Sequence, residues 1–522
     1  MRPVPRAFEF PSILFYVALA AASSAVCAQI NIYLGITPNT AVVGVLVAIA
    51  LGRTALPQFK SADRQVMVET ATSAGGFAGA NIALVSLASL YLLGLERLVL
   101  PLLFGISLGM VLDIWLAYRL FGTRAFPADA AWPDGEAVGR VIQAGDEGGT
   151  LARQLLQGIA AGALGRLLTL PMAGVGIAFI GNPAALAALA AGLLMRGHAL
   201  LIGLDLIHSH VPHGLMIGGG LVQVGQTAWL FWRSRAGAPS HLGGARVKSV
   251  ETAQPSGARA GSLAGGELLA HLGLFVAGAA AMGVLGGLWS GAGASRAVWL
   301  WVGFAGAAAL VHTIIVGYCA MLSGWFPSFA VAIALILIAA LLRFPVEALA
   351  LLAGYILSTG PQFADLGYDL KSGWIIRGRG VDADREQRGR RQQVWLQEIG
   401  ALVGIVTAAL AFTAYWRLGL VPPMSRVVAA TVEVAVTPSL ATELAVGALI
   451  GAAIQAAGGA RRALGILLAT GLLLDNVLYG YALVAALLLR AWLGTARMGV
   501  RAPGLIAGDG LAGFASAIVR AF

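Results

Sequence analysis

The chain has 522 residues, of which 58% are hydrophobic and only 11% are charged. A water-soluble domain has no way to bury so much apolar side chain, so this composition excludes a soluble protein and indicates one that crosses a membrane many times. The formal net charge of +10 does not indicate nucleic-acid binding, because lysine and arginine gather in loops that flank apolar stretches, as the positive-inside rule describes.

Apolar stretches recur from Phe10 to Phe522, and they are continuous rather than alternating. Backbone polar groups in lipid must be satisfied within the protein, which leaves helices or closed barrels, and continuous runs are typical of helices. We therefore predict an all-α, polytopic integral membrane protein with about 14–16 transmembrane helices, at roughly 20 residues for each crossing. The 70 glycines favour close packing between these helices.

The predicted spans fall into four blocks in chain order. The first block holds four spans, and a polar loop then leads to a second block of short or re-entrant segments that break at prolines. A linker rich in glycine, serine and arginine follows, then a third block, a highly charged stretch and a last block. Within the charged stretch we expect Asp369 and Lys371 to belong to a cytoplasmic gate or loop rather than to the binding site. The bounds are 11–33, 40–56, 66–93 and 98–121 for the first four spans, 122–151 for the loop, 151–232 for the second block with breaks at Pro171, Pro183 and Pro212, 233–262 for the linker, 265–360 for the third block, 365–398 for the charged stretch and 399–522 for the last block.

An even number of spans in each block places the basic N-terminus and both basic loops on the cytoplasmic side. We divide the chain into a first transmembrane half, residues 1–233, a cytoplasmic linker, 234–262, and a second transmembrane half, 263–522, which together form one transport unit. Similar short charged segments precede Glu69 and Glu398, which favours two pseudo-repeat halves. Charged loops before helices are common, so unrelated halves stay the alternative.

A polar stripe opens the third predicted span. Gln65, Glu69 and Ser73 are spaced four residues apart and share one helix face, with Thr72 beside them. A carboxylate that faces lipid is costly, so the stripe must face protein or water, and the glycines that follow permit close backbone approach or local unwinding. We interpret the stripe as part of a substrate or proton path. The alternative is an interfacial Glu69 with hydroxyls that bond to their own helix.

Three of the seven histidines lie close together. His208, His210 and His213 surround Pro212, and Asp205 precedes them by three residues. Imidazoles at this spacing bind transition metals or relay protons, whereas the simpler interpretation is an interfacial turn at headgroup depth. We assign no firm metal site on this basis, and both interpretations stay open.

The last block carries two further polar groups within apolar sequence. Asp475 and Asn476 share one helix face with Tyr479, so an acid, an amide and a phenol are expected to lie together in mid-span. Asp509 sits between two glycines, so backbone groups can approach its carboxylate. Ionisable residues inside a membrane are functional candidates by default. We expect these side chains, with those of His210 and His213, to contribute polar groups near the midplane.

Several stretches in collinear order carry a resemblance to a known family. They are Asn31–Thr37, residues 65–79, Val211–Gln223, Tyr368–Gly373 followed by Gln392 and Gln393, and Gly504–Gly513. In these stretches the chain resembles the bacterial branch of the oligopeptide transporter family, which includes yellow-stripe-like metal-chelate transporters. The resemblance implies secondary active transport of peptides or peptide-like metal chelates, generally driven by protons. It adds Asn31 and Tyr33 to the candidate pathway residues.

We therefore expect a proton-coupled symporter in a bacterial inner (plasma) membrane, with its N-terminus in the cytoplasm, that works by alternating access. The expected partners are protons, lipid and a small-molecule peptide or metal chelate, with no cofactor and no nucleic acid, and the sequence leaves the oligomeric state open. A channel or scaffold without coupled transport is the alternative. Buried carboxylates favour coupling, because their protonation can bias a protein between two states.

An enzyme is not expected. Ile506 stands where an intramembrane aspartyl protease needs the first glycine of its Gly-x-Gly-Asp motif before Asp509, and seven histidines are too few for a di-iron membrane oxygenase. No phosphate-binding loop is present in the sequence, which argues against ATP-driven pumping.

Overall fold

Helices make up every named element of the computed structural model, and the residues that it describes contain no β-strand. The structure describes residues 4–35, 44–45, 47–49, 56–144, 149–206, 209–235, 263–290, 295–323, 327–433, 440–459, 462–474, 476–494, 498–499 and 501–521.

The elements on the two sides of the linker are as follows. Before it lie α1 (Ser12–Leu34), η1 (Pro57–Lys60), α3 (Ala62–Phe77), the π-helix η2 (Ala78–Leu84), α4 (Val85–Leu92), η3 (Glu96–Leu98), α5 (Val99–Leu120), α6 (Pro133–Ala144), α7 (Gly149–Leu167), α8 (Met172–Ile180), α9 (Pro183–His198), η5 (Ala199–Ile202) and α10 (Val211–Arg235). After it lie α11 (Leu263–Leu285), α12 (Ser295–Ser323), α13 (Ser328–Leu341), α14 (Val346–Leu357), α15 (Pro361–Ile376), α16 (Ala383–Arg417), α17 (Pro423–Glu433), α18 (Leu440–Gly458), α19 (Leu464–Leu473), α20 (Val477–Leu493) and α21 (Arg501–Ala521).

The length and composition of these helices suit a bilayer. Within the described ranges, nine helices are long and apolar enough to cross a membrane, and α13, α19 and α20 are shorter apolar helices. Large apolar side chains such as Leu341 and Trp492 are 82% and 81% exposed, as expected of a surface that lipid covers. The prediction of an all-α, polytopic membrane protein is confirmed, and the number of crossings stays a prediction.

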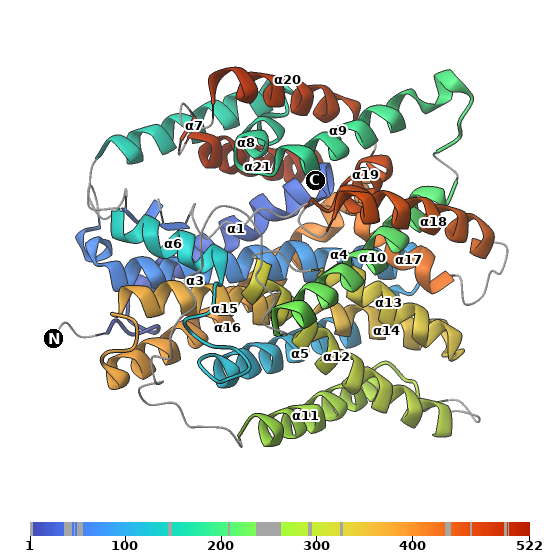
Figure 1. The fold of residues 1–522 in the computed structure, drawn as a ribbon, viewed down its shortest axis with the longest axis horizontal. Coiled ribbons are helices and arrows are strands. Elements are labelled where there is room, and N and C mark those ends of the chain that lie inside the picture. The colour runs from blue at the N-terminus through green and yellow to red at the C-terminus, as the bar shows by residue number, and fades with distance from the viewer. Residues whose placement is uncertain are drawn as a thin grey trace.

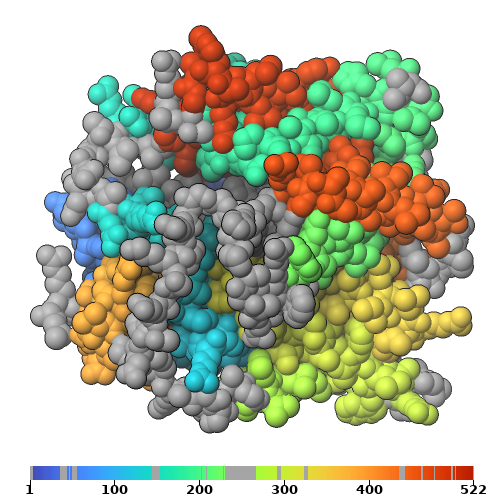
Figure 2. Space-filling model, in the orientation of Figure 1, coloured from blue at the N-terminus to red at the C-terminus, as the bar shows by residue number. Residues whose placement is uncertain are grey.

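The helices form two groups in space, and each group draws on both sides of the linker. In the first group α7 and α8 lie against α21, α9 lies against α19 and α20, and α10 lies against α18. Figure 1 shows α7, α8, α20 and α21 together at the top, and Figure 2 shows α18, in orange, over the green α10. In the second group α1 and α3 pack on α16, and α15 contacts α3, α5, α6 and α12. Because α1 also contacts α21, it joins the two groups.

Prolines set the start of several short helices. α8 begins directly after Pro171, and α9 begins at Pro183, where the missing N–H costs nothing because the first turn of a helix has no partner for it. Pro212 lies in the first turn of α10 for the same reason. The predicted breaks at these three prolines are therefore helix starts, and they divide the second block into short segments.

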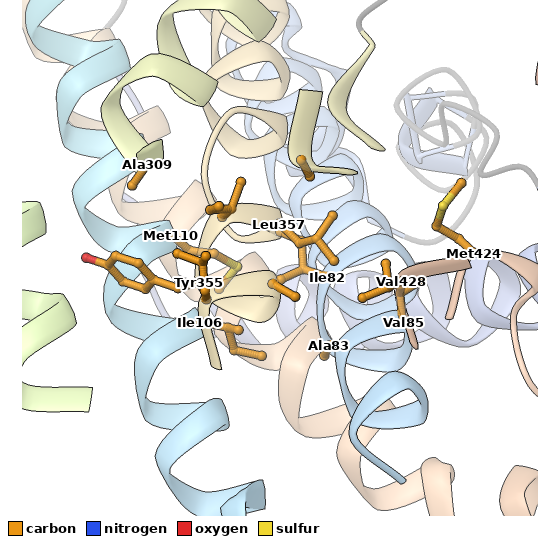
Figure 3. Close-up of a cluster of buried hydrophobic side chains, with 14 of the residues drawn as sticks. Ile82, Ala83, Val85, Ile106, Met110, Ala309, Tyr355, Leu357, Met424 and Val428 are labelled. Carbon is orange, nitrogen blue, oxygen red and sulfur yellow. The ribbon is translucent and has the colours of Figure 1, made fainter. Parts of the chain in front are cut away.

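A large apolar core fills the second group. Ile82 of η2 and Val85 of α4 pack with Ile106 of α5, Leu357 of α14 and Val428 of α17 (Figure 3). All of these side chains are buried. The core therefore fixes the position of the π-helix η2, which continues directly from α3.

Small residues let α3 and α16 approach each other closely. A Cβ atom on Gly400 of α16 would lie 2.5 Å from the carbonyl oxygen of Ala71, and one on Gly404 would collide with the carbonyl oxygen of Gly75. On its other side, a Cβ atom on Gly75 would lie 2.5 Å from the carbonyl oxygen of Ala20 in α1. The backbones of α1, α3 and α16 are thus in direct contact, as expected where small residues form the interface between membrane helices.

We expect Gly404→Val to lower the melting temperature of the purified protein in detergent, because overpacking a tight contact costs about 1–3 kcal/mol. Gly303→Val is the matched control, since a Cβ atom at Gly303 of α12 meets nothing within 4 Å. Tryptophan fluorescence during heating measures both variants. Equal melting temperatures for the two variants would contradict the close α3–α16 contact.

Candidate functional site

A buried polar cluster lies between α3 and α15. Ser372 Oγ donates a hydrogen bond to Glu69 Oε2 over 2.6 Å, and Ser73 Oγ donates one to Asp369 Oδ2 over 3.0 Å. All four side chains are buried, and none is more than 1% exposed. Each hydrogen bond joins a residue before the linker to a residue after it, so the cluster ties the two parts of the sequence together.

Two glutamines of α16 border this cluster. Gln393 donates to the backbone carbonyl of Asp369 over 2.5 Å and to the hydroxyl of Thr70 over 3.3 Å. Gln397 donates to the carboxyl of Asp365 over 2.8 Å. The buried Asp365 is therefore a third carboxyl in the same region, and it too is bonded to a neutral group.

The pairing of the three carboxyls decides how much charge is buried here. Among the residues that the structure describes, Glu69, Asp365 and Asp369 form no ion pair. The nearby Arg377 is engaged instead with Glu386, at an Nε–Oε2 distance of 2.8 Å. Burying several unpaired negative charges together is prohibitively costly, so protons must neutralise part of this cluster.

Glu69 and Asp369 provide a place for one such proton. Glu69 Oε1 is buried and accepts no hydrogen bond within the described residues, and the Asp369 carboxyl lies near enough to interact with Glu69. Two carboxyl groups bond to each other only when one of them carries a proton, because an ionised carboxylate has no donor. The arrangement thus suits a proton held between α3 and α15.

The other members of the predicted stripe have local roles. Gln65 Nε2 donates to the carbonyls of Phe59 and Lys60, over 3.1 and 3.4 Å, and so ties η1 to α3. Thr72 Oγ1 donates to the carbonyl four residues earlier in its own helix, over 2.7 Å. Of the stripe, Glu69 and Ser73 enter the cluster.

A second polar cluster lies where α1, α7, α20 and α21 meet. The Arg166 guanidinium stands over the Tyr33 ring, 4.5 Å from its centroid, and the rings of Tyr33 and Tyr479 stack with their centroids 5.9 Å apart. Arg166 Nη1 makes a long hydrogen bond of 3.5 Å to the Tyr479 hydroxyl, and its Nε is 3.8 Å from Asp509 Oδ1. Three predicted residues thus surround Arg166, a residue that no sequence pattern indicated.

Asp509 has a structural partner of its own. Its Oδ2 accepts a hydrogen bond of 2.6 Å from the backbone N–H of Ala173, in the first turn of α8. Asp113 of α5 has the same role for α15, because its Oδ2 accepts 2.7 Å from the N–H of Phe363. In both places a buried aspartate satisfies the start of a short helix and complements its dipole.

Asn31 and the histidines lie elsewhere. Asn31 Nδ2 donates to Asn81 Oδ1 over 3.0 Å and to the carbonyl of Ala80 over 3.3 Å, which ties α1 to η2. The ring centroids of His210 and His213 lie 5.3 Å apart. The backbone N–H of His210 donates a hydrogen bond of 2.6 Å to Glu443 Oε2 of α18.

The described histidines His210 and His213 do not belong to a group that could hold a metal ion. Within the described ranges no group of three His, Cys, Asp or Glu side chains is placed to hold a metal ion. Asp205 is exposed, and Asn476 immediately precedes α20. His208 and Asp475 lie outside the described residues.

The expectation that Asp369 and Lys371 lie in a loop is wrong, whereas a role for them in a gate stays a prediction. Residues 365–376 belong to α15 and residues 383–398 to the first half of α16, and Asp369 and Lys371 are buried in α15. Lys371 Nζ donates to the carbonyls of Ala128 and Ala130, over 3.0 and 2.8 Å. A usable signal was present, because Asp365 and Asp369 are four residues apart on one helix face.

Fold and buried polar clusters together define an all-α, multi-pass membrane protein with ionisable groups in its interior. No family model matches the chain, and no curated protein matches it either.

Proposed function

We propose that the chain is a secondary active transporter, a proton-coupled symporter that moves oligopeptides or peptide-like metal chelates across a bacterial inner membrane by alternating access. The observation that carries this proposal is the buried pair of Glu69 and Asp369, which forms no ion pair within the described residues, because the nearby Arg377 is paired with Glu386. The protonated and deprotonated states of a buried carboxyl pair differ strongly in free energy. A coupling site needs this property, because proton binding can then shift the protein between two conformations.

Burial of the pair supports alternating access in particular. Glu69 is fully buried and Asp369 is 1% exposed, so a proton can reach them only when helices around the pair separate. The pair lies between α3 and α15, and these helices come from opposite sides of the linker. Relative movement of α3 and α15 would therefore both open the pair to one side of the membrane and break its hydrogen bonds.

The substrate class in this proposal comes from the sequence resemblance. The stretch that contains Glu69 and Ser73 and the stretch Tyr368–Gly373, with Gln393, are among those similar to the oligopeptide transporter family. In the structure these stretches meet, since Ser372 bonds Glu69 and Gln393 bonds the backbone of Asp369. Sequence stretches that lie about 300 residues apart thus form one site, which supports a shared role for them.

Uptake into liposomes tests the proposal. The purified protein is reconstituted, and a pool of tripeptides, with and without Ni²⁺, is offered with an inward proton gradient, without a gradient and with a protonophore. We expect accumulation above the external concentration only with the gradient. Flux that does not depend on the proton gradient would instead support a channel. Absence of uptake for the whole pool would reject this substrate class.

A further inference from the structure

We propose that Arg166 and the two tyrosines beside it bind a carboxylate group of a small organic anion. This inference rests on the proposed function in one respect, since it takes the anion to be the transported molecule. The binding step itself needs no proton gradient, so it can be measured separately from transport.

The first support is the small number of partners that Arg166 has. A guanidinium carries five N–H donors, and among the described residues the groups that approach it are the hydroxyls of Tyr33 and Tyr479 and the carboxylate of Asp509. The contact to Tyr479 is at the 3.5 Å limit, and the contact to Asp509, at 3.8 Å, is too long for a hydrogen bond. Most of the donors on Arg166 are therefore available to a ligand.

The contact with Asp509 is too long to occupy a donor of Arg166. The Asp509 carboxylate is committed to the first turn of α8 through the N–H of Ala173, at 2.6 Å, and the helix dipole there stabilises its negative charge. It stands on the Nε side of Arg166. Nη1 and Nη2 can bind a carboxylate through two parallel hydrogen bonds if Nη1 gives up or shares its long contact with Tyr479, and lysine cannot form this two-bond geometry.

The guanidinium is also held in place and remains accessible. Stacking on Tyr33, whose ring in turn stacks on Tyr479, fixes the plane of the guanidinium from one side and lowers the ordering cost of binding. The Arg166 side chain is 17% exposed, whereas that of Asp509 is 1% exposed. A small anion can therefore reach Arg166 without displacing the structural contact of Asp509.

The test compares two probes that differ only in the group to be recognised. Trialanine has a terminal carboxylate, and trialanine amide does not. Binding is measured from the rise in melting temperature of the full-length protein in detergent, over a range of probe concentrations, because a ligand that prefers the folded state raises it. We expect trialanine to bind at least about tenfold more tightly than its amide, which corresponds to ~1.4 kcal/mol.

Two variants locate the effect. Arg166→Lys keeps the charge but loses the two-bond geometry, and we expect it to weaken trialanine binding about tenfold, or ~1.4 kcal/mol, without changing binding of the amide. Arg153→Lys, at an exposed position on the same helix α7, is the matched control and should bind trialanine like the wild type. Protection of Arg166 from phenylglyoxal by trialanine, read by mass spectrometry, gives a second measurement that needs no variant.

The inference is overturned if trialanine and its amide raise the wild-type melting temperature equally, if neither raises it, or if Arg166→Lys binds trialanine with wild-type affinity. Failure of the proposed function gives a different result. Trialanine that binds at Arg166 while no member of the tripeptide pool enters liposomes would leave the binding inference standing and reject the proposed substrate class.

Discussion

Glu69→Gln should abolish uptake driven by a proton gradient while the protein still folds and inserts. Glutamine has nearly the shape of a protonated glutamic acid and can accept the 2.6 Å hydrogen bond from Ser372, so the α3–α15 contact survives. It cannot release a proton, so the pair with Asp369 loses its two states. Reconstituted uptake with and without the gradient, beside gel filtration in detergent, measures the result.

Two further variants sharpen this prediction. Glu69→Asp keeps an ionisable group but shortens the reach to Ser372, so we expect slower uptake that still depends on the gradient. Glu267→Gln is the control, because Glu267 pairs with Arg119 at the surface, where the two side chains are 21% and 52% exposed. Full gradient-driven accumulation by Glu69→Gln would remove Glu69 from the coupling mechanism.

Glu386→Gln should give the largest loss of stability. Arg377 and Glu386 are 3% and 6% exposed, and their side chains form a two-bond contact of 2.8 and 3.1 Å. Removing one member of a buried ion pair leaves the other charge uncompensated, which costs about 3–5 kcal/mol. Arg377 also holds Gln393, at 2.8 Å, so the loss reaches the border of the Glu69 cluster.

The matched control for this prediction is Glu347→Gln. Glu347 pairs with Arg97 over a similar distance of 2.9 Å, but the two side chains are 36% and 65% exposed. An exposed pair contributes about 0–1 kcal/mol, so this variant should melt close to the wild type. Melting temperatures in detergent compare the two, and an equal shift would mean that the Arg377–Glu386 pair is not buried as the structure has it.

The long apolar helices could be predicted from the sequence because lipid imposes a simple rule on them. The predicted spans 11–33 and 98–121 agree with α1 and α5 to within a residue or two. The third span, 66–93, corresponds to the continuous run from α3 through η2 to α4. In each case roughly 20 apolar residues lie between turn or charge signals, and tertiary contacts are not needed to recognise them.

The buried polar helices could not be recognised by the same rule. Residues 365–398 contain enough charge to look like a cytoplasmic loop, yet α15 is buried along nearly its whole length. Its carboxyls are tolerated because Ser73 of α3 bonds Asp369 and Gln397 of α16 bonds Asp365, and these partners are distant in the sequence. Hydropathy reports on lipid-facing segments and fails for a helix that only other helices surround.

The candidate site was predictable in part for a related reason. Glu69 and Ser73 were found because helical spacing puts them on one face. Their partners Asp369 and Ser372 are set by which helix packs against α3. A single sequence does not reveal which helix that is. Arg166 gave no local pattern at all, because its role arises only where Tyr33, Tyr479 and Asp509 converge on it.

Proton entry that accompanies the substrate is the quantity that separates coupled transport from every other function considered for this chain. Liposomes that contain the wild-type protein and a trapped pH-sensitive dye, with equal pH on both sides, are given an inward gradient of the tripeptide pool. We expect the lumen to acidify with the wild type and to stay unchanged with Glu69→Gln. Tripeptide entry without acidification in the wild type would contradict the account.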